Sequence, residues 1–346
     1  MQRVLSNIGL VIECRDFRVP LTSWNPLLEK SLMSSASPVG GGERARIIVY
    51  TKRDLGPTAS DAATEGPSGS EIVNRLAAFH QREGHASAVV FLGKGGAGGT
   101  KLLDVVKRVA REHDSLTGLR ALGVGMPHAG KSTLLNRLRA QGMGLGKAAK
   151  TGSEPGVTRK LGTPVRIVPG GDGSENEDGS RGGGFGEGVY IMDTPGVFVP
   201  YVSDAESMLK LALVGCVKDG LVSHVTVADY LLYHLNLRDP ALYAAYCGEP
   251  TNDVHEFLRG VARRTGKLVK GGEPSLEGAA DWIIKEWRNG ELGRFVLDEV
   301  NDRTLAAAVK ASAKPPMSMN QARKREKELR KARQMERMAA QAQDAV

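Results

Sequence analysis

The chain has 346 residues, 41% of them apolar, and a formal net charge of +8 at pH 7. This length suits two domains with ordinary cores, and no apolar run approaches the roughly 20 residues that a membrane-spanning helix needs. The three cysteines are far apart and form no C-x-x-C pair, so neither a disulfide framework nor a structural zinc site is indicated, and a reducing compartment is expected.

The first part of the chain alternates apolar strands with polar segments. Residues 8–14 predict a buried strand followed by the turn-rich loop 16–26, and residues 46–50 predict a second strand. The stretch 56–70 is rich in Gly, Pro, Ser and Thr and is typical of a flexible insertion. After it the sequence predicts a helix with Ile72, Leu76 and Phe79 on one face, a third strand at 88–92 and a helix at 101–113.

The second predicted strand ends in T-K-R-D, which is close to the N-K-x-D motif that reads guanine in GTPases. Asp54 can accept hydrogen bonds from the guanine N1–H and 2-amino groups, which adenine does not offer, while the Lys52 stem packs over the ring. Thr51 replaces the usual Asn, and an ordinary surface loop explains these four residues equally well on their own. Gly93 and Lys94 occupy the place of a second, backbone-mediated contact to the base.

Residues 125–132 read G-x-x-x-x-G-K-S, the spacing of a phosphate-binding loop, after an apolar run and before a helix that begins near residue 131. In such a loop the backbone N–H groups surround the phosphates, the lysine reaches the β and γ oxygens, and the hydroxyl meets Mg²⁺. A chance match in a glycine-rich chain is the alternative for this motif alone. The nucleotide-binding residues predicted here are Gly125, Met126, Pro127, His128, Ala129, Gly130, Lys131, Ser132 and Thr133.

Two further segments carry residues that would sense the γ-phosphate. Thr158, in P-G-V-T-R, lies where a switch threonine would coordinate Mg²⁺. Residues 169–188 are almost entirely Gly, Ser, Asp and Glu and predict a disordered insertion. The strand 189–193 then ends in D-T-P-G, where Asp193 can hold a Mg²⁺-bound water and the Gly196 N–H can meet the γ-phosphate. The predicted metal-binding residues are therefore Ser132, Thr158 and Asp193.

The order of these motifs is permuted relative to ordinary small GTPases, because the base motif comes before the phosphate loop. In this order the chain resembles the circularly permuted GTPases of the YlqF/RbgA group, and most closely their mitochondrial ribosome-associated members. The resemblance rests on D-F-R-V-P-L-T-S-W-N-P at 16–26, T-K-R-D, G-M-P-H-A-G-K-S, P-G-V-T-R and D-T-P-G-V. It covers the chain to about residue 300.

The resemblance implies a domain order. Residues 1–203 are expected to form an α/β, circularly permuted P-loop GTPase domain, 204–300 a smaller all-α domain, and 301–346 a basic, flexible or helical tail. The apolar residues at helical spacing in 204–300 are better explained as core faces of a small bundle than as contacts to RNA. Residues 311–346 hold nine Lys and Arg against four Asp and Glu, which indicates either a solvated charge run or a contact to a phosphate backbone.

The function implied by the resemblance is GTP binding and hydrolysis in the assembly of the large subunit of the mitochondrial ribosome. It implies GTP and Mg²⁺ as cofactors, and the large subunit and its RNA as partners. A mitochondrial location, in the matrix with a peripheral contact to the inner membrane, follows from the resemblance only, since no transit peptide is visible. The rivals are a P-loop ATPase, against which Asp54 argues, and a regulatory module that holds nucleotide with little turnover.

No residue in the sequence is identified as the group that activates the attacking water. Val197 stands where Ras-like enzymes place a glutamine, which predicts slow hydrolysis until the ribosomal subunit stimulates it. Related GTPases use a histidine ahead of the first strand, whereas the first histidine here is His80, and a truncated N-terminus is expected. His128 stands where an asparagine helps to bind potassium in related proteins, so potassium dependence stays open.

Overall fold

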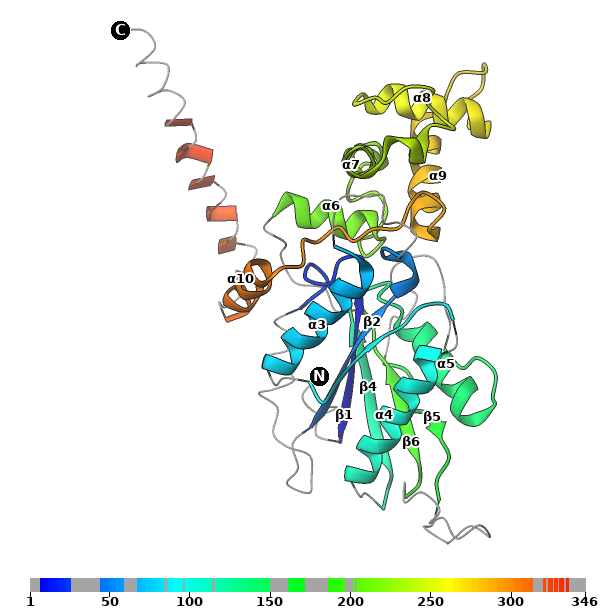
Figure 1. Ribbon diagram of the computed structural model, residues 1–346, viewed down its shortest axis with the longest axis vertical. Helices are drawn as coiled ribbons and strands as arrows, with labels where there is room; N and C mark the ends of the chain where they lie inside the picture. The colour runs from blue at the N-terminus through cyan, green and yellow to red at the C-terminus, as the bar shows by residue number, and fades with distance from the viewer. Residues whose placement is uncertain are drawn as a thin grey trace.

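A computed structural model describes residues 7–25, 44–58, 67–83, 86–95, 97–113, 116–149, 161–171, 186–196, 202, 204–313 and parts of 320–335. Several features singled out in the sequence lie outside these ranges: Thr158, Val197, most of the stretches 56–70 and 169–188, and most of the tail 311–346. The described residues form a six-stranded sheet flanked by helices, with a further group of helices beyond one end of the strands (Figure 1).

The strand order of the sheet is β3-β2-β1-β4-β6-β5, and all neighbours are parallel except β5, which runs antiparallel to β6. The strands are β1 Leu10–Asp16, β2 Ala45–Thr51, β3 Ala88–Phe91, β4 Leu119–Gly125, β5 Val165–Val168 and β6 Val189–Asp193. Asp16 pairs with Thr51, and Gly123 pairs with Asp193. The base motif, the phosphate loop and D-T-P-G therefore all leave the sheet at the carboxyl ends of its parallel strands.

Five of these strands match the strands predicted from the sequence, with bounds that shift by up to two residues. The exception is β5, which the sequence pattern did not indicate. It has four residues and its second position is the exposed Arg166, so it offers only a short and interrupted apolar run. An edge strand of this kind forms because β6 provides the hydrogen-bonding partner.

Helices cover both faces of the sheet (Figure 1). α4 (Ala97–His113) and α5 (Lys131–Met143) share a core with one face. α3 (Gly69–Glu83) and α10 (Asp302–Ala313) pack on the other face, where Leu305 joins a cluster of buried residues from β2 and α3. The first residues of the segment 301–346 therefore pack against the sheet domain. That the rest of this segment forms a basic tail stays a prediction.

The remaining helices lie beyond the carboxyl ends of the strands (Figure 1). They are α6 Ala205–Leu213, α7 His224–Arg238, the short 3-10 helix η3 Pro240–Tyr243, α8 Val254–Thr265 and α9 Leu276–Asn289. Their apolar faces form one core around Leu231, Phe257 and Trp287, and Val19 and Met126 from the sheet domain extend into it. None of the helices among the described residues is long and apolar enough to cross a membrane.

A buried carboxylate lies within the sheet. Glu13 on β1 accepts a hydrogen bond from the Arg15 Nε atom (2.7 Å) and another from the Arg46 Nη2 atom (2.5 Å). All three side chains are almost completely buried. Burial alone would raise the pKa of Glu13, but the two guanidinium groups outweigh it and lower the pKa to about 2. Glu13 is therefore charged and paired at neutral pH.

Replacing Glu13 with glutamine is expected to lower the free energy of unfolding by about 3–5 kcal/mol at pH 7, because two buried guanidinium groups lose their counter-charge. The lowered pKa means that the carboxylate contributes stability above its ordinary pKa of 4.5, and that this contribution is lost as the pH falls toward 2. Urea denaturation at pH 7 and pH 3 measures both effects. The variant should lose less stability than the wild type between these pH values, and equal stability of the two proteins at pH 7 would contradict the prediction.

Candidate nucleotide-binding site

The segment between β4 and α5 forms a tight loop that depends on its glycines. Gly125 has a φ of 144° and Gly130 a φ of 84°, which non-glycine residues rarely adopt. A Cβ atom on Gly125 would lie 2.3 Å from the Cys14 carbonyl oxygen, so the loop can leave β4 beside β1 only with glycine there. His128 also has a positive φ, of 57°. Because α5 begins at Lys131, its first N–H groups and the positive end of its dipole face the loop.

The Lys131 ammonium lies inside this loop. It donates hydrogen bonds to the carbonyl oxygens of Gly125 (3.2 Å) and Met126 (2.8 Å), and the residue is only 9% exposed. Burial lowers the pKa of Lys131. This placement fits the predicted role of Lys131 at the phosphates of a nucleotide.

Two of the three residues predicted to bind a metal, Ser132 and Asp193, meet at the first turn of α5. The Ser132 hydroxyl donates a hydrogen bond to the Asp193 Oδ2 atom at 2.5 Å. The Thr194 hydroxyl donates to the Gly123 carbonyl (2.7 Å) and holds the end of β6 against β4. A Cβ atom on Gly196 would lie 2.5 Å from the backbone nitrogen of Pro127, so D-T-P-G runs directly against the phosphate loop.

A hydroxyl and one carboxylate are hard oxygen donors that suit Mg²⁺, which in nucleotide sites takes few protein ligands and completes its shell with phosphate and water. Ser132 and Asp193 fit this requirement. The described residues contain no group of three or more His, Cys, Asp or Glu side chains that could hold a metal without such help. Thr158, the third predicted ligand, lies outside the described residues.

The base motif lies beside the phosphate loop. Thr51 ends β2, and its hydroxyl oxygen lies 3.0 Å from the Ala129 carbonyl, to which it donates a hydrogen bond. Asp54 belongs to the 3-10 helix η1 (Arg53–Leu55), and its Oδ1 atom accepts a hydrogen bond from the Lys94 backbone N–H (3.1 Å). Thr51 thus joins the base motif to the phosphate loop, even though it replaces the asparagine expected there.

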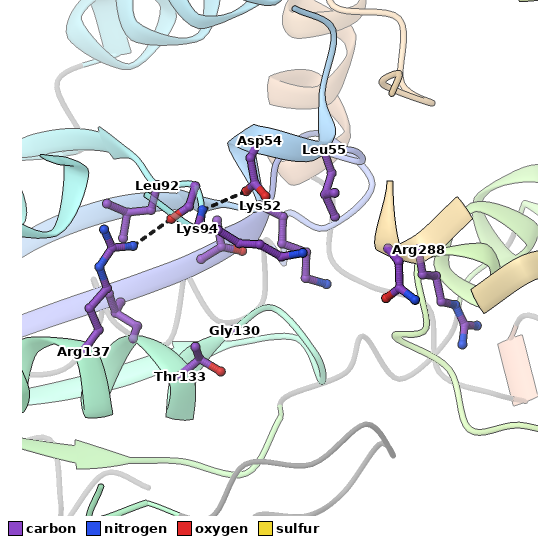
Figure 2. A pocket seen from close by; sticks show the side chains of 13 residues that line it. Lys52, Asp54, Leu55, Leu92, Lys94, Gly130, Thr133, Arg137 and Arg288 are labelled. Carbon is purple, nitrogen blue, oxygen red and sulfur yellow. Dashed lines mark hydrogen bonds between the residues drawn. The ribbon is translucent and has the colours of Figure 1, made fainter. Parts of the chain in front are cut away.

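A cavity of about 420 Å³ connects these parts (Figure 2). Figure 2 shows Lys52, Asp54 and Lys94 on one side of it, Gly130 and Thr133 on another, and Arg288 of α9 across from them. The lining residues include Thr51, Lys52, Asp54, Gly93, Lys94, Gly130, Thr133, Arg137, Arg288 and Asn289. The cavity therefore brings the predicted base motif, the predicted second base contact and the phosphate loop to one place.

A family model described as "50S ribosome-binding GTPase" matches residues 120–245. Mitochondrial GTPase 1 of Schizosaccharomyces pombe is 34% identical over 316 residues, which cover 88% of this chain and 87% of that protein. The chain belongs to the mitochondrial GTPase 1 family. Mitochondrial GTPase 1 of Saccharomyces cerevisiae is 32% identical, with 83% of this chain and 74% of that protein covered. Mitochondrial ribosome-associated GTPase 1 of Xenopus tropicalis is 29% identical, with 86% and 90% covered.

The fold of this member of the mitochondrial GTPase 1 family is also found in a solved structure. The crystal structure of GNP-bound YlqF from T. maritima matches with a TM-score of 0.50 and 23% sequence identity, covering 87% of this chain and 97% of that one. The predicted α/β, circularly permuted P-loop GTPase fold is confirmed, and so is the resemblance to the YlqF/RbgA group.

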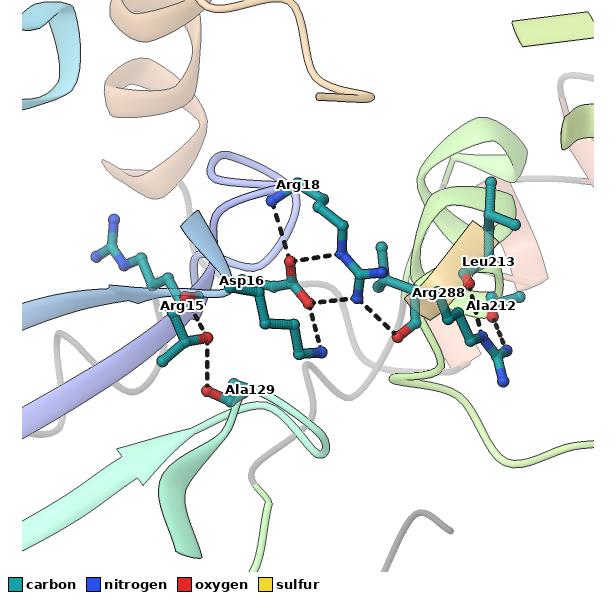
Figure 3. Close-up of polar contacts among 10 residues, drawn as sticks. Arg15, Asp16, Arg18, Ala129, Ala212, Leu213 and Arg288 are labelled. Carbon is teal, nitrogen blue, oxygen red and sulfur yellow. Dashed lines mark hydrogen bonds and ion pairs between the residues drawn. The ribbon is translucent and has the colours of Figure 1, made fainter. Parts of the chain in front are cut away.

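Asp16, Arg18 and Lys52 form a charge cluster next to the base motif of this mitochondrial GTPase 1 relative. The sequence pattern did not indicate this cluster. The Asp16 carboxylate is fully buried and accepts hydrogen bonds from the Lys52 Nζ atom (2.8 Å) and the Arg18 Nη2 atom (2.8 Å). Burial would raise the pKa of Asp16, but these two cations hold it well below its ordinary value. Arg18 also donates to the Val214 carbonyl (3.3 Å) and lies over the Trp287 ring, as Figure 3 shows in part. Lys52 is thereby connected to the helical domain.

Proposed function

We propose that this protein binds and hydrolyses GTP in mitochondria as an assembly factor for the large ribosomal subunit. The observation that carries the proposal is the hydrogen bond between the Thr51 hydroxyl and the Ala129 carbonyl, since it joins a guanine-type base motif to a phosphate loop. The ribosomal partner is supported by the relative named mitochondrial ribosome-associated GTPase 1 and by the family model described as ribosome-binding. RNA contact through residues 311–346 and a peripheral position on the inner membrane are finer predictions.

In this proposal the protein's own groups bind and orient the triphosphate. The loop N–H groups and the Lys131 ammonium stabilise the negative charge of the β and γ phosphates in the transition state. Ser132 and Asp193 would hold Mg²⁺, which when bound neutralises charge on the same phosphates. Asp54 selects guanine, because its carboxylate accepts from the N1–H and 2-amino groups that adenine lacks.

We expect slow turnover by the protein alone. Phosphoryl transfer is catalysed mainly by positioning and charge stabilisation, so a site that lacks a group to orient the attacking water is incomplete. The position of the Ras-type glutamine is the apolar Val197, which lies outside the described residues. The proposed partner, the large subunit, would complete the site.

Adding large ribosomal subunits is expected to raise the rate of steady-state GTP hydrolysis at least about tenfold over that of the protein alone. The reason is that a group from the subunit would orient the attacking water, which the protein by itself does not do. Phosphate release is measured with and without subunits, in sodium and in potassium buffers, with ATP in parallel. The Lys131→Ala variant with subunits is the control for hydrolysis by the subunit preparation. Fast GTP hydrolysis by the protein alone, at a rate that subunits do not change, would contradict this prediction. It would show that the protein itself supplies the group that orients the attacking water.

The same assay separates the rival functions. Equal turnover of ATP and GTP would favour a P-loop ATPase, and would mean that Asp54 does not read the base. Nucleotide binding without turnover in any of these mixtures would favour a regulatory module. Turnover of GTP but not of ATP, seen only when the large subunit is present, supports the proposed function.

A further inference from the structure

The C-terminal end of α9 packs against the base-reading turn. Gly290 ends this helix with a φ of 87°, and a Cβ atom there would lie 2.8 Å from the Leu55 Cδ2 atom. Leu55 directly follows Asp54 and is only 8% exposed. The last two residues of α9, Arg288 and Asn289, line the same cavity as Asp54 (Figure 2). One wall of the candidate site therefore comes from the helical domain.

Arg288 holds this end of α9 in place. Its Nε atom donates to the Leu213 carbonyl (2.9 Å) and its Nη2 atom donates to the Ala212 carbonyl (2.8 Å), as Figure 3 shows. Both carbonyls belong to the C-terminal end of α6, where a cation also meets the negative end of the helix dipole. The neighbouring Trp287 lies against the Arg18 guanidinium, 5.0 Å from the ring centroid. The guanidinium of Arg288 is thus directed at α6.

Asn289 is placed differently. It is the last residue of α9, it is exposed, and it lines the cavity together with Lys52 and Asp54. Its side-chain amide makes no hydrogen bond to another residue in the part of the chain that the structure describes. An amide offers donors and an acceptor, which match the mixed donor and acceptor groups of a nucleoside.

We propose that Asn289 contacts the nucleoside part of the bound guanine nucleotide and that Arg288 is its positioning residue. The inference rests on the proposed function, since it takes a guanine nucleotide as the ligand of the cavity. In the proposed function the phosphates lie elsewhere, at Lys131 and beside the Mg²⁺ held by Ser132, so Asn289 acts on GDP and GTP alike. Nucleotide affinity therefore depends on the helical domain as well as on the sheet domain.

The test is isothermal titration calorimetry of unlabelled GDP and GTP with Asn289→Ala, because a fluorescent group on the ribose would disturb the proposed contact. The variant is expected to bind both nucleotides about 3- to 10-fold more weakly, which corresponds to the loss of one hydrogen bond. Alanine is a better helix former than asparagine, so the fold should be unaffected. Glu291→Ala changes an exposed neighbour that does not line the cavity and should bind like the wild type.

Arg288 is tested by a double-mutant cycle. Arg288→Ala is expected to weaken GDP binding in the wild-type background and to add little further loss in the Asn289→Ala background, because both changes remove the same contact. Additive losses would overturn the positioning role of Arg288. Unfolding temperatures of all variants without nucleotide separate a loss of stability from a loss of the contact.

The outcomes distinguish this inference from the proposed function. Affinities of Asn289→Ala within about twofold of the wild type for both nucleotides would overturn the nucleoside contact and leave the proposed function intact. A loss of GTP affinity alone would also overturn it, because the effect would then lie at the γ-phosphate. Failure of the wild type to bind GDP or GTP would overturn both.

Discussion

Replacing Lys131 with alanine is expected to weaken GTP binding by at least about 100-fold, because a buried ammonium beside phosphate makes strong, charge-assisted hydrogen bonds. The Lys131 Nζ atom is held at the Gly125 and Met126 carbonyls, inside the loop where the β and γ phosphates are expected. Arg137, another cation that lines the cavity, is bonded to the Gly93 carbonyl (2.7 Å) and would have to give up this bond to replace Lys131. Calorimetric titration with GTP and Mg²⁺ measures the loss.

The control for this substitution is Lys147→Ala, which removes the same charge from an exposed position after α5. It should bind GTP like the wild type. Circular dichroism and the unfolding temperature show whether Lys131→Ala keeps its fold, which we expect because the freed carbonyls can bind water instead. A folded Lys131→Ala variant with normal GTP affinity would mean that the loop at 125–132 does not bind phosphate.

Replacing Asp54 with asparagine is expected to weaken GTP binding on the order of 100-fold and to abolish the preference for GTP over ATP. The carboxylate accepts from two donors on the guanine edge, and an amide would oppose one of them with a donor of its own. The Lys94 N–H, which now lies 3.1 Å from the Asp54 Oδ1 atom, can still bond to the amide oxygen, so the turn should persist. Competition titrations with GTP, ATP and XTP measure the selectivity.

XTP is an internal control, because its base carries a carbonyl where guanine has the 2-amino group. An asparagine at position 54 can donate to this carbonyl, so the variant should bind XTP more tightly than GTP. Asp104→Asn, an exposed change on α4, should leave the preference for GTP unaltered. Equal affinity of the wild type for GTP and ATP would show that Asp54 does not read the base.

The base motif T-K-R-D is a weaker match in the sequence than in the structure. Thr51 stands where a guanine motif has an asparagine, which weakens the match of the sequence pattern. In the folded protein the requirement at this position is a donor for the Ala129 carbonyl, and a hydroxyl meets it at 3.0 Å. The register of β1 and β2, with Asp16 beside Thr51, also brings the Lys52 ammonium to Asp16. Neither fact is visible in the local pattern, because both depend on a neighbouring strand or loop.

The sequence by itself determined the α/β class, because the base motif, the phosphate loop and D-T-P-G each follow a local apolar run. The permuted order of these motifs then indicated the family. Parallel strands end on one side of a sheet, so motifs at their ends must meet there, and Ser132 reaches Asp193 for this reason. Only the tertiary structure decided that α9 forms a wall of the base cavity and that α10 returns to α3. These contacts join elements that are far apart in the chain. The residues next to Arg288 and Leu305 in the sequence do not indicate which surface these side chains will contact, because that depends on how whole helices pack against the sheet domain.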